Sequence, residues 1–291
     1  MSFKSLRSPL NNRGSNITTG TVSGKVEQFQ MNEIAAFQGF GVTVDVSGSY
    51  AKTTSGDYDV YTFTGPGSWV FKSSGTVSNL YIDGTGGGGG GGGAPNPGAP
   101  FGPAGSGGGG GSGAMGIVYA DGFQAATTWT ITTGGAGTGG PAQNGAAAGQ
   151  SGGSGGTTSV ADPSNTLVSF GGGGGGSGGS FDPHPSPTRG GAGGSGGPIT
   201  VHPSLTTRVA LGGEAGELGS NSTSPGGNGG SPKWPSFNPY AIIPVPSPIQ
   251  SDTSGGGPGG PSPNPGTAGE PGHFLRIFYD RNNNNFTINE L

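Results

Sequence analysis

Hydrophobic and polar residues alternate between about residues 40 and 83, and this alternation predicts a small β-sheet. Successive side chains of a strand point to opposite faces, so a period of two indicates extended chain. The pattern is carried by Val42, Val44 and Val46, and then by Tyr61 and Phe63. A Gly-Pro-Gly turn separates them from a second apolar run, WVF, and a third run, LYI, follows. We therefore predict a β unit in this region.

From residue 84 onward the pattern changes, because blocks of glycine alternate with short apolar stretches. The glycine-rich blocks occupy residues 84–94, 105–114, 134–140, 149–156, 171–179, 190–197, 226–230 and 255–260. Their spacing is irregular, which excludes collagen, where every third residue is glycine. Trp69 and Trp129 lie in strand-like stretches, and we expect both in a core.

Composition argues against an ordinary globule. Of 291 residues, 71 are glycine and 25 are proline, a share usually associated with low-complexity or disordered chains. However, disordered chains combine high net charge with few aromatic residues. Here the net charge is only −4 and aromatic residues make up 8%. We infer that something other than a large apolar core orders this chain.

Polyglycine II helices would supply that order. Such a helix has three residues per turn and no internal hydrogen bonds, so its N–H and C=O groups can bond to neighbouring helices. Only glycine lets the backbones approach closely enough. We predict an all-β protein with polyglycine II helices, divided into an N-terminal attachment arm (1–39), a small β unit (40–83), a glycine-rich bundle with protruding loops (84–281) and a C-terminal tail (282–291). Residues 22–38 are compatible with a short helix or an extended arm.

Candidate catalytic and cofactor chemistry is sparse in this sequence. There is no cysteine for a thiolate metal site, no basic run for nucleic acid, and no Walker pattern for nucleotides. His184 and His202 both precede proline and would bind a metal only if their loops met, so we interpret them as solvated loop residues. We predict no catalytic residues, no metal and no cofactor, and hence no enzyme. The absence of a long apolar stretch predicts neither a signal peptide nor membrane insertion, so we expect a protein made in a cytoplasm.

Two aromatic stretches are better candidates for recognition. In KWPSFNPY, closely spaced prolines hold Trp234, Phe237 and Tyr240. Rigid aromatic rings lose little entropy on binding and suit adaptable recognition surfaces, including sugar rings. A second candidate is SFDPHPSPTR, with Phe181 and His184. The alternative is that these rings cap the glycine bundle and supply part of its core.

The order of elements resembles a known family. An aromatic strand pair, YDVYTFTGPGSWVF, precedes VSNLYIDGTGGGGGGGG; the stretches GIVYADGF, TTWTITTGGAGTGG and NTLVSFGGGGGGSGG follow, and GEPGHFLRIFYD closes the series. Residues from about 58 to 280 thereby resemble the glycine-rich domain of bacteriophage tail-fibre and tail-tip proteins. The polyglycine II tail-fibre adhesins of T-even-like phages are a more distant likeness. The proline-dense segment 233–249 and the Asn-rich segment 282–285 depart from the common pattern.

This resemblance implies a virion component at or near a fibre tip that attaches to the host surface without catalysis. The expected partners are other virion tail proteins, through the N-terminal region, and a host glycan or outer-membrane protein. Fibre proteins of this kind are homotrimers or single adhesins seated on a trimeric fibre. The alternatives are a purely structural virion protein of the capsid, neck or baseplate, and an extracellular glycine-rich structural or ice-binding protein.

Overall fold

The computed structural model describes residues 42–72, 75–77, 80–96, 104–120, 123–125, 128–144, 147–180, 191–220, 226–231, 255–261, 263–270, 275–280 and 286–291. These residues contain strands and no helix, so the prediction of an all-β protein is confirmed. The strands are β1 (Val42–Ser55), β2 (Tyr58–Phe71), β3 (Gly75–Val77), β4 (Leu80–Thr85), β5 (Pro95–Asn96), β6 (Met115–Ala120), β7 (Phe123–Ala125), β8 (Thr128–Thr132), β9 (Gln143–Asn144), β10 (Thr158–Ala161), β11 (Thr166–Phe170), β12 (Ile199–Val201), β13 (Thr206–Leu211), β14 (Leu275–Asp280) and β15 (Phe286–Glu290). The predicted arm over 1–39 lies outside the described residues.

Eleven of the strands form one sheet that folds over into two facing halves. The first part of β2 pairs with β14, which leads on to β4, β6 and β13. The last part of β2 pairs with β8, which leads on to β10, β11 and β12. Because β12 also contacts β13 and β6, the sheet is nearly closed. We call these the β4 half and the β10 half.

A sharp corner in the β1–β2 hairpin lets one pair of strands serve both halves. The pairing register shifts between Gly48 and Tyr50, and Gly48 has a φ of 111°, a left-handed conformation that favours glycine. A Cβ at Gly48 would also overlap the carbonyl oxygen of Pro66. The bulge and the glycine therefore turn the hairpin around the edge of the sheet.

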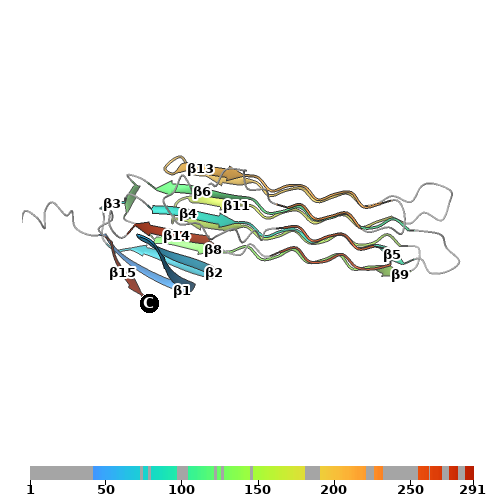
Figure 1. Ribbon diagram of the computed structural model, residues 1–291, viewed down its shortest axis with the longest axis horizontal. Helices are drawn as coiled ribbons and strands as arrows, with labels where there is room; N and C mark the ends of the chain where they lie inside the picture. Colours follow the sequence, from blue (N-terminus) through green and yellow to red (C-terminus); the bar gives the residue numbers. More distant parts are fainter. Residues whose placement is uncertain are drawn as a thin grey trace, which may run out of the picture.

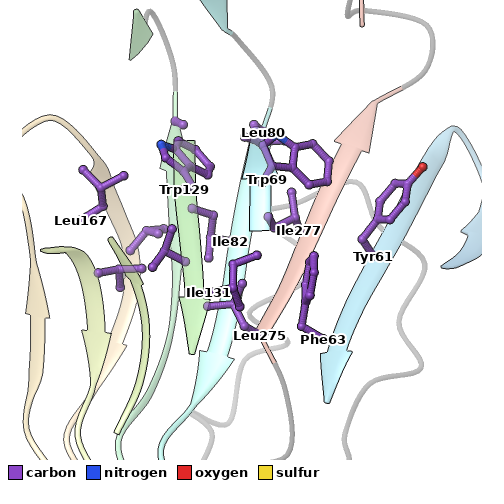
Figure 2. Close-up of a cluster of buried hydrophobic side chains, with 14 of the residues drawn as sticks. Tyr61, Phe63, Trp69, Leu80, Ile82, Trp129, Ile131, Leu167, Leu275 and Ile277 are labelled. Atoms are coloured by element: carbon purple, nitrogen blue, oxygen red, sulfur yellow. The ribbon is translucent and has the colours of Figure 1, made fainter. Parts of the chain in front are cut away.

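The apolar core lies between the two halves, as Figure 2 shows. Trp69 of β2 pairs directly with Trp129 of β8, and both rings are fully buried. From the β4 half, Leu80 and Ile82 point into the same space. The prediction that both tryptophans are core residues is confirmed.

The glycine-rich sequences run out from one end of the sheet as extended segments that lie side by side (Figure 1). The described chain contains ten of them, at residues 86–94, 104–114, 133–142, 148–157, 171–180, 191–198, 212–220, 226–231, 255–261 and 264–270. Most continue directly from a strand or lead into one; for example, 86–94 follows β4 and 104–114 precedes β6. The segments therefore leave the sheet and return to it in turn.

Backbone hydrogen bonds join these segments with a repeat of three residues. In segment 86–94, the N–H groups of Gly86, Gly89 and Gly92 all donate to segment 104–114. The N–H groups of Gly87, Gly90 and Gly93 donate to segment 148–157 instead. The third series, from Gly88, Gly91 and Ala94, donates to segment 264–270. One segment thus donates in three directions around its axis.

Segments 86–94 and 104–114 occupy the interior of the array, and each bonds to six others. All their residues are buried, and they contain only glycine, alanine and serine. In outer segments, larger residues occupy exposed positions such as Thr138 and Pro258.

The two regions that composition separated in the sequence, 40–83 and 84–281, both contribute strands to the same sheet.

Candidate functional site: the far end of the glycine segments

The end of the glycine segments that lies away from the sheet is where the chain repeatedly reverses. We call it the far end. Here β5 and β9 pair in parallel, and the side-chain amide of Asn96 donates to Asn144 at 3.2 Å (Figure 1). Because outgoing and returning segments alternate, the connections over 97–103, 181–190 and 221–225 begin and end here.

Phe181 and His184 lie outside the described residues, but the flanks of their segment are placed. Ser180 accepts a hydrogen bond from the N–H of Gly105, and the N–H of Gly191 donates to Ser106. Gly105 and Ser106 stand at the far end of an inner segment. The connection that carries these two predicted recognition residues therefore starts and finishes at the far end.

Trp234, Phe237 and Tyr240 also lie outside the described residues, and their connection is anchored differently. The N–H of Gly230 donates to Gly110, and the N–H of Gly256 donates to Gly230. Segment 226–231 runs parallel to segment 104–114, which leads into β6. Segment 226–231 therefore ends, and segment 255–261 begins, on the side of the array that faces the sheet and not at the far end.

Of His184 and His202, only His202 is described. It lies at the sheet end of the molecule, whereas the residues flanking the connection that contains His184 lie at the far end. It lies in the turn between β12 and β13, where its Nδ1 atom is 2.8 Å from the hydroxyl of Ser204. Among the residues that the structure places, no three His, Cys, Asp or Glu side chains form a group that could hold a metal.

Acidic residues of the outer segments lie along the sides of the array. The side-chain amide of Asn228 donates to Glu217 at 2.7 Å, and the backbone N–H of Gly255 donates to Glu270 at 3.3 Å. Both carboxylates are used to join neighbouring segments. They are structural contacts on the sides of the array.

A cluster at the edge of the sheet fixes the C-terminal strand β15 against β1. Lys52 contacts Glu290 at 2.8 Å, and the hydroxyl of Tyr61 donates to the same carboxylate at 3.1 Å. The hydrogen bond from Lys52 lowers the pKa of Glu290, and burial raises the pKa of Tyr61 to about 12. Residues 286–290 of the predicted tail thus complete the sheet edge.

The ion pair between Asp83 and Arg276 was missed by sequence reasoning. Both side chains are buried, and the two residues pair directly across β4 and β14. They are 193 positions apart, so no local pattern brings them together. The available signal was one charged residue, Asp83 or Arg276, next to the apolar residues of each of two strand sequences, LYIDGT and LRIFYD.

Comparison with known proteins leaves the family open. The chain matches no protein-family model and no curated protein. Within the described residues, no helix is long and apolar enough to cross a bilayer.

Proposed function

We propose that the ten glycine segments are polyglycine II helices packed as a bundle. The three-residue repeat of their hydrogen bonds supports this, because polyglycine II has three residues per turn and bonds only to its neighbours. A Cβ at Gly90 would overlap the carbonyl oxygen of Thr138, and one at Gly109 would overlap that of Asn228. The spacing between segments therefore requires glycine in the interior.

The bundle presents exchangeable connections at its far end, and we propose that this protein attaches a phage virion to its host. The observation that carries this proposal is that the described residues flanking the connections over 97–103, 181–190 and 221–225 lie together at one end of the segments. Their sequences can vary without changing a scaffold that is held by backbone atoms. The protein acts as a non-enzymatic tail-fibre or tail-tip adhesin for a host glycan or outer-membrane protein.

The two ends of the molecule suit this role. Val42 lies at the end of the sheet that is remote from the glycine segments. It pairs with Phe286, and Val44 of the same strand pairs with Phe71 at that end of β2. The N-terminal region, which precedes Val42 in the sequence, is proposed to join other virion tail proteins. Attachment to the particle and contact with the host are thereby separated along the long axis (Figure 1).

Exchange of connections between host-range variants tests this function. Phage carrying a replaced 181–189 segment should lose or switch adsorption, while purified protein keeps its thermal unfolding temperature. A replacement of residues 231–252 in parallel examines the predicted site at Trp234, Phe237 and Tyr240. Adsorption that survives replacement of every far-end connection would instead favour a purely structural protein of the capsid, neck or baseplate.

Amide exchange tests the scaffold separately. Gly86–Gly93 should be strongly protected in the purified protein, since each of their N–H groups donates to a neighbouring segment. Within Gly171–Gly176, the same protection is expected at the four glycines whose N–H groups donate, which are Gly171, Gly173, Gly174 and Gly176. Rapid exchange at Gly86–Gly93 would remove the scaffold, whatever the adsorption experiment shows.

One observation favours the ice-binding alternative as a second candidate. Ser151, Ser154 and Thr157 are exposed at every third position of segment 148–157. With a rise of about 3.1 Å per residue, such a face repeats every ~9 Å. Thermal hysteresis in the purified protein would support that function over attachment, and its absence would remove it.

A further inference from the structure

Two outer segments hold equivalent positions on opposite sides of the glycine array. Segments 171–180 and 255–261 each bond to both inner segments and to one outer segment on either side. Each is therefore the middle of a layer of three segments. We call the outward side of the layer that contains 171–180 the open face, and its segments are 148–157, 171–180 and 191–198.

The middle segment of the open face leaves one series of backbone groups unpaired. Every other residue from 171 to 179 uses both its N–H and its C=O in bonds to the four segments around it. Within the described part of the chain, neither the N–H nor the C=O of Gly172, Gly175 and Gly178 has a hydrogen-bond partner. Because the bonds repeat every three residues, the groups of this series point to the outward side.

The opposite layer has no such free donors in its middle segment. The series of 255–261 whose N–H groups are not needed by a neighbouring backbone consists of Gly255, Pro258 and Pro261. Proline has no N–H, and the N–H of Gly255 donates to the carboxylate of Glu270. Proline at an edge is one of the devices that keep a sheet from pairing with another chain. The open face lacks this protection.

The side chains that flank the free groups are small and uncharged. Ser151, Ser154 and Thr157 are exposed on one flank, and Ser195 is exposed on the other. The three segments of the open face contain no charged residue. The glutamates of the array all lie in other segments, at positions 214, 217 and 270. Two copies of the open face would therefore meet without repulsion between like charges.

Serine already joins glycine segments inside the array. The hydroxyl of Ser106 accepts from the N–H of Ser220, and that of Ser112 accepts from the N–H of Glu214, both at 2.7 Å. The exposed serines of the open face can accept backbone N–H groups of a further segment in the same way. This chemistry fits a partner that itself consists of glycine segments.

The uncharged surface continues from the glycine segments onto the sheet. Ser159 of β10 pairs with Thr132 of β8 and with Ser169 of β11, which in turn pairs with Thr200 of β12. Successive side chains of a strand alternate between its faces, so this row lies opposite the core residues of the same strands. A contact through the open face can thus extend along the length of the molecule.

We propose that two copies of this chain pair through their open faces about a two-fold axis. Such an isologous contact uses the same surface on both partners. The N–H groups of Gly172, Gly175 and Gly178 in one copy donate to the carbonyl groups of the same series in the other, because both series have the same three-residue repeat. This inference does not depend on attachment to a host, since it uses only the bonds of the segments.

Sedimentation velocity of the purified full chain over a range of concentrations tests the pairing. We expect a reversible equilibrium between monomer and dimer. In Ser154→Glu with Ser195→Glu, like charges would face each other across the contact, and the dissociation constant should rise at least ~10-fold. The matched control, Leu218→Glu with Ala268→Glu, adds the same charge at exposed positions outside the open face and should dimerise as the original chain does.

Three outcomes of this experiment overturn the proposal. A chain that stays monomeric at every concentration leaves the open face to a glycan or to ice. A trimer contradicts the two-fold contact. An equal loss of dimer in the control pair would assign the effect to net charge and not to the open face.

Amide exchange in the unmodified chain remains decisive if the charged variant fails to fold. Exchange at Gly172, Gly175 and Gly178 should slow several-fold as the concentration is raised and dimer forms. The N–H groups of Ala136 and Leu218, also unpaired among the described residues but outside the open face, should exchange at a constant rate. Exchange at the three glycines that is independent of concentration contradicts the pairing. So does protection that appears only when purified host envelope polysaccharide is added, which would make a glycan the occupant.

Discussion

The sheet and the glycine segments both have an interior, but they fill it with different atoms. Between the halves of the sheet, the space is occupied by large side chains such as Trp69, Trp129 and Phe170. Around segments 86–94 and 104–114 it is occupied by the backbone atoms of neighbouring segments. One region is organised by apolar surface and the other by hydrogen bonds.

This difference shows why the two regions depend on each other. Ordering a residue costs on the order of 1–2 kcal/mol, glycine is at the upper end of that cost, and a hydrogen bond contributes about 1 kcal/mol net. A single glycine segment therefore gains almost nothing by ordering. The sheet, stabilised by apolar burial, aligns the segments so that many bonds form together.

Crowding the interior of the glycine array should have the largest effect. In Gly87→Ala, Gly90→Ala and Gly93→Ala combined, each added methyl group would overlap a backbone carbonyl of segment 133–142. Overpacking costs about 1–3 kcal/mol per site. We therefore expect the free energy of unfolding of the triple variant to fall by about 3–9 kcal/mol in thermal or denaturant unfolding. Gly135→Ala is the matched control, because its Cβ would meet nothing within 4 Å, and it should change stability by less than ~0.5 kcal/mol. Equal effects would show that the backbones are not closely packed.

Removing a large side chain from the core of the sheet should have the second-largest effect on stability. Trp129→Ala removes a fully buried ring that packs edge-on against Phe71 at 5.0 Å, and such a change costs about 3–5 kcal/mol. If the sheet aligns the glycine segments, amide protection of Gly86–Gly93 should fall together with that of the strands. Leu218→Ala, at a side chain 73% exposed, serves as the control. Protection of the glycines that survives the loss of the sheet would separate the two regions.

Removing one side-chain hydrogen bond inside the array should have a smaller effect. The hydroxyl of Ser112 accepts from the N–H of Glu214 at 2.7 Å, and its side chain is buried. Ser112→Ala should cost about 1 kcal/mol in chemical denaturation and raise exchange at Glu214. Ser154→Ala, at an exposed position, is expected to be neutral. A neutral Ser112→Ala would mean that the backbone bonds of this segment suffice.

Acid should loosen only the edge strand, with the smallest effect. The pKa values of Glu290 and Asp45 are lowered, chiefly by hydrogen bonds from Lys52 and Lys72. Their ionised forms therefore stabilise the pairing of β15 above their ordinary pKa values, and this contribution is lost as pH falls through the lowered ones, below about pH 4. Amide protection of Thr287 and Asn289 should decline there before that of β4, and Glu290→Gln should weaken the pH dependence.

Local pattern was sufficient for part of this fold. Period-two alternation predicted strands around Val44 and Tyr61, and the strand context of Trp69 and Trp129 predicted their burial. Glycine content predicted where the long segments lie. These features depend on residues close together in the sequence or on composition.

The long-range arrangement was beyond local pattern. β14 enters the sheet between β2 and β4, nearly two hundred residues after them, and this is what joins Asp83 to Arg276. Nor does composition tell which end of the array receives a connection. That depends on whether the preceding segment runs toward or away from the sheet, and it distinguishes the connection of Phe181 from that of Trp234.

The three-residue repeat also sets the permitted lengths of this molecule. Adding three residues to each segment restores every donor to its former direction, and in the proposed polyglycine II helices it would extend the array by about 9 Å. Adding one or two would rotate the following residues, so that exposed side chains such as Thr138 would turn toward a backbone. The glycine segments of related chains should therefore differ in length by multiples of three residues.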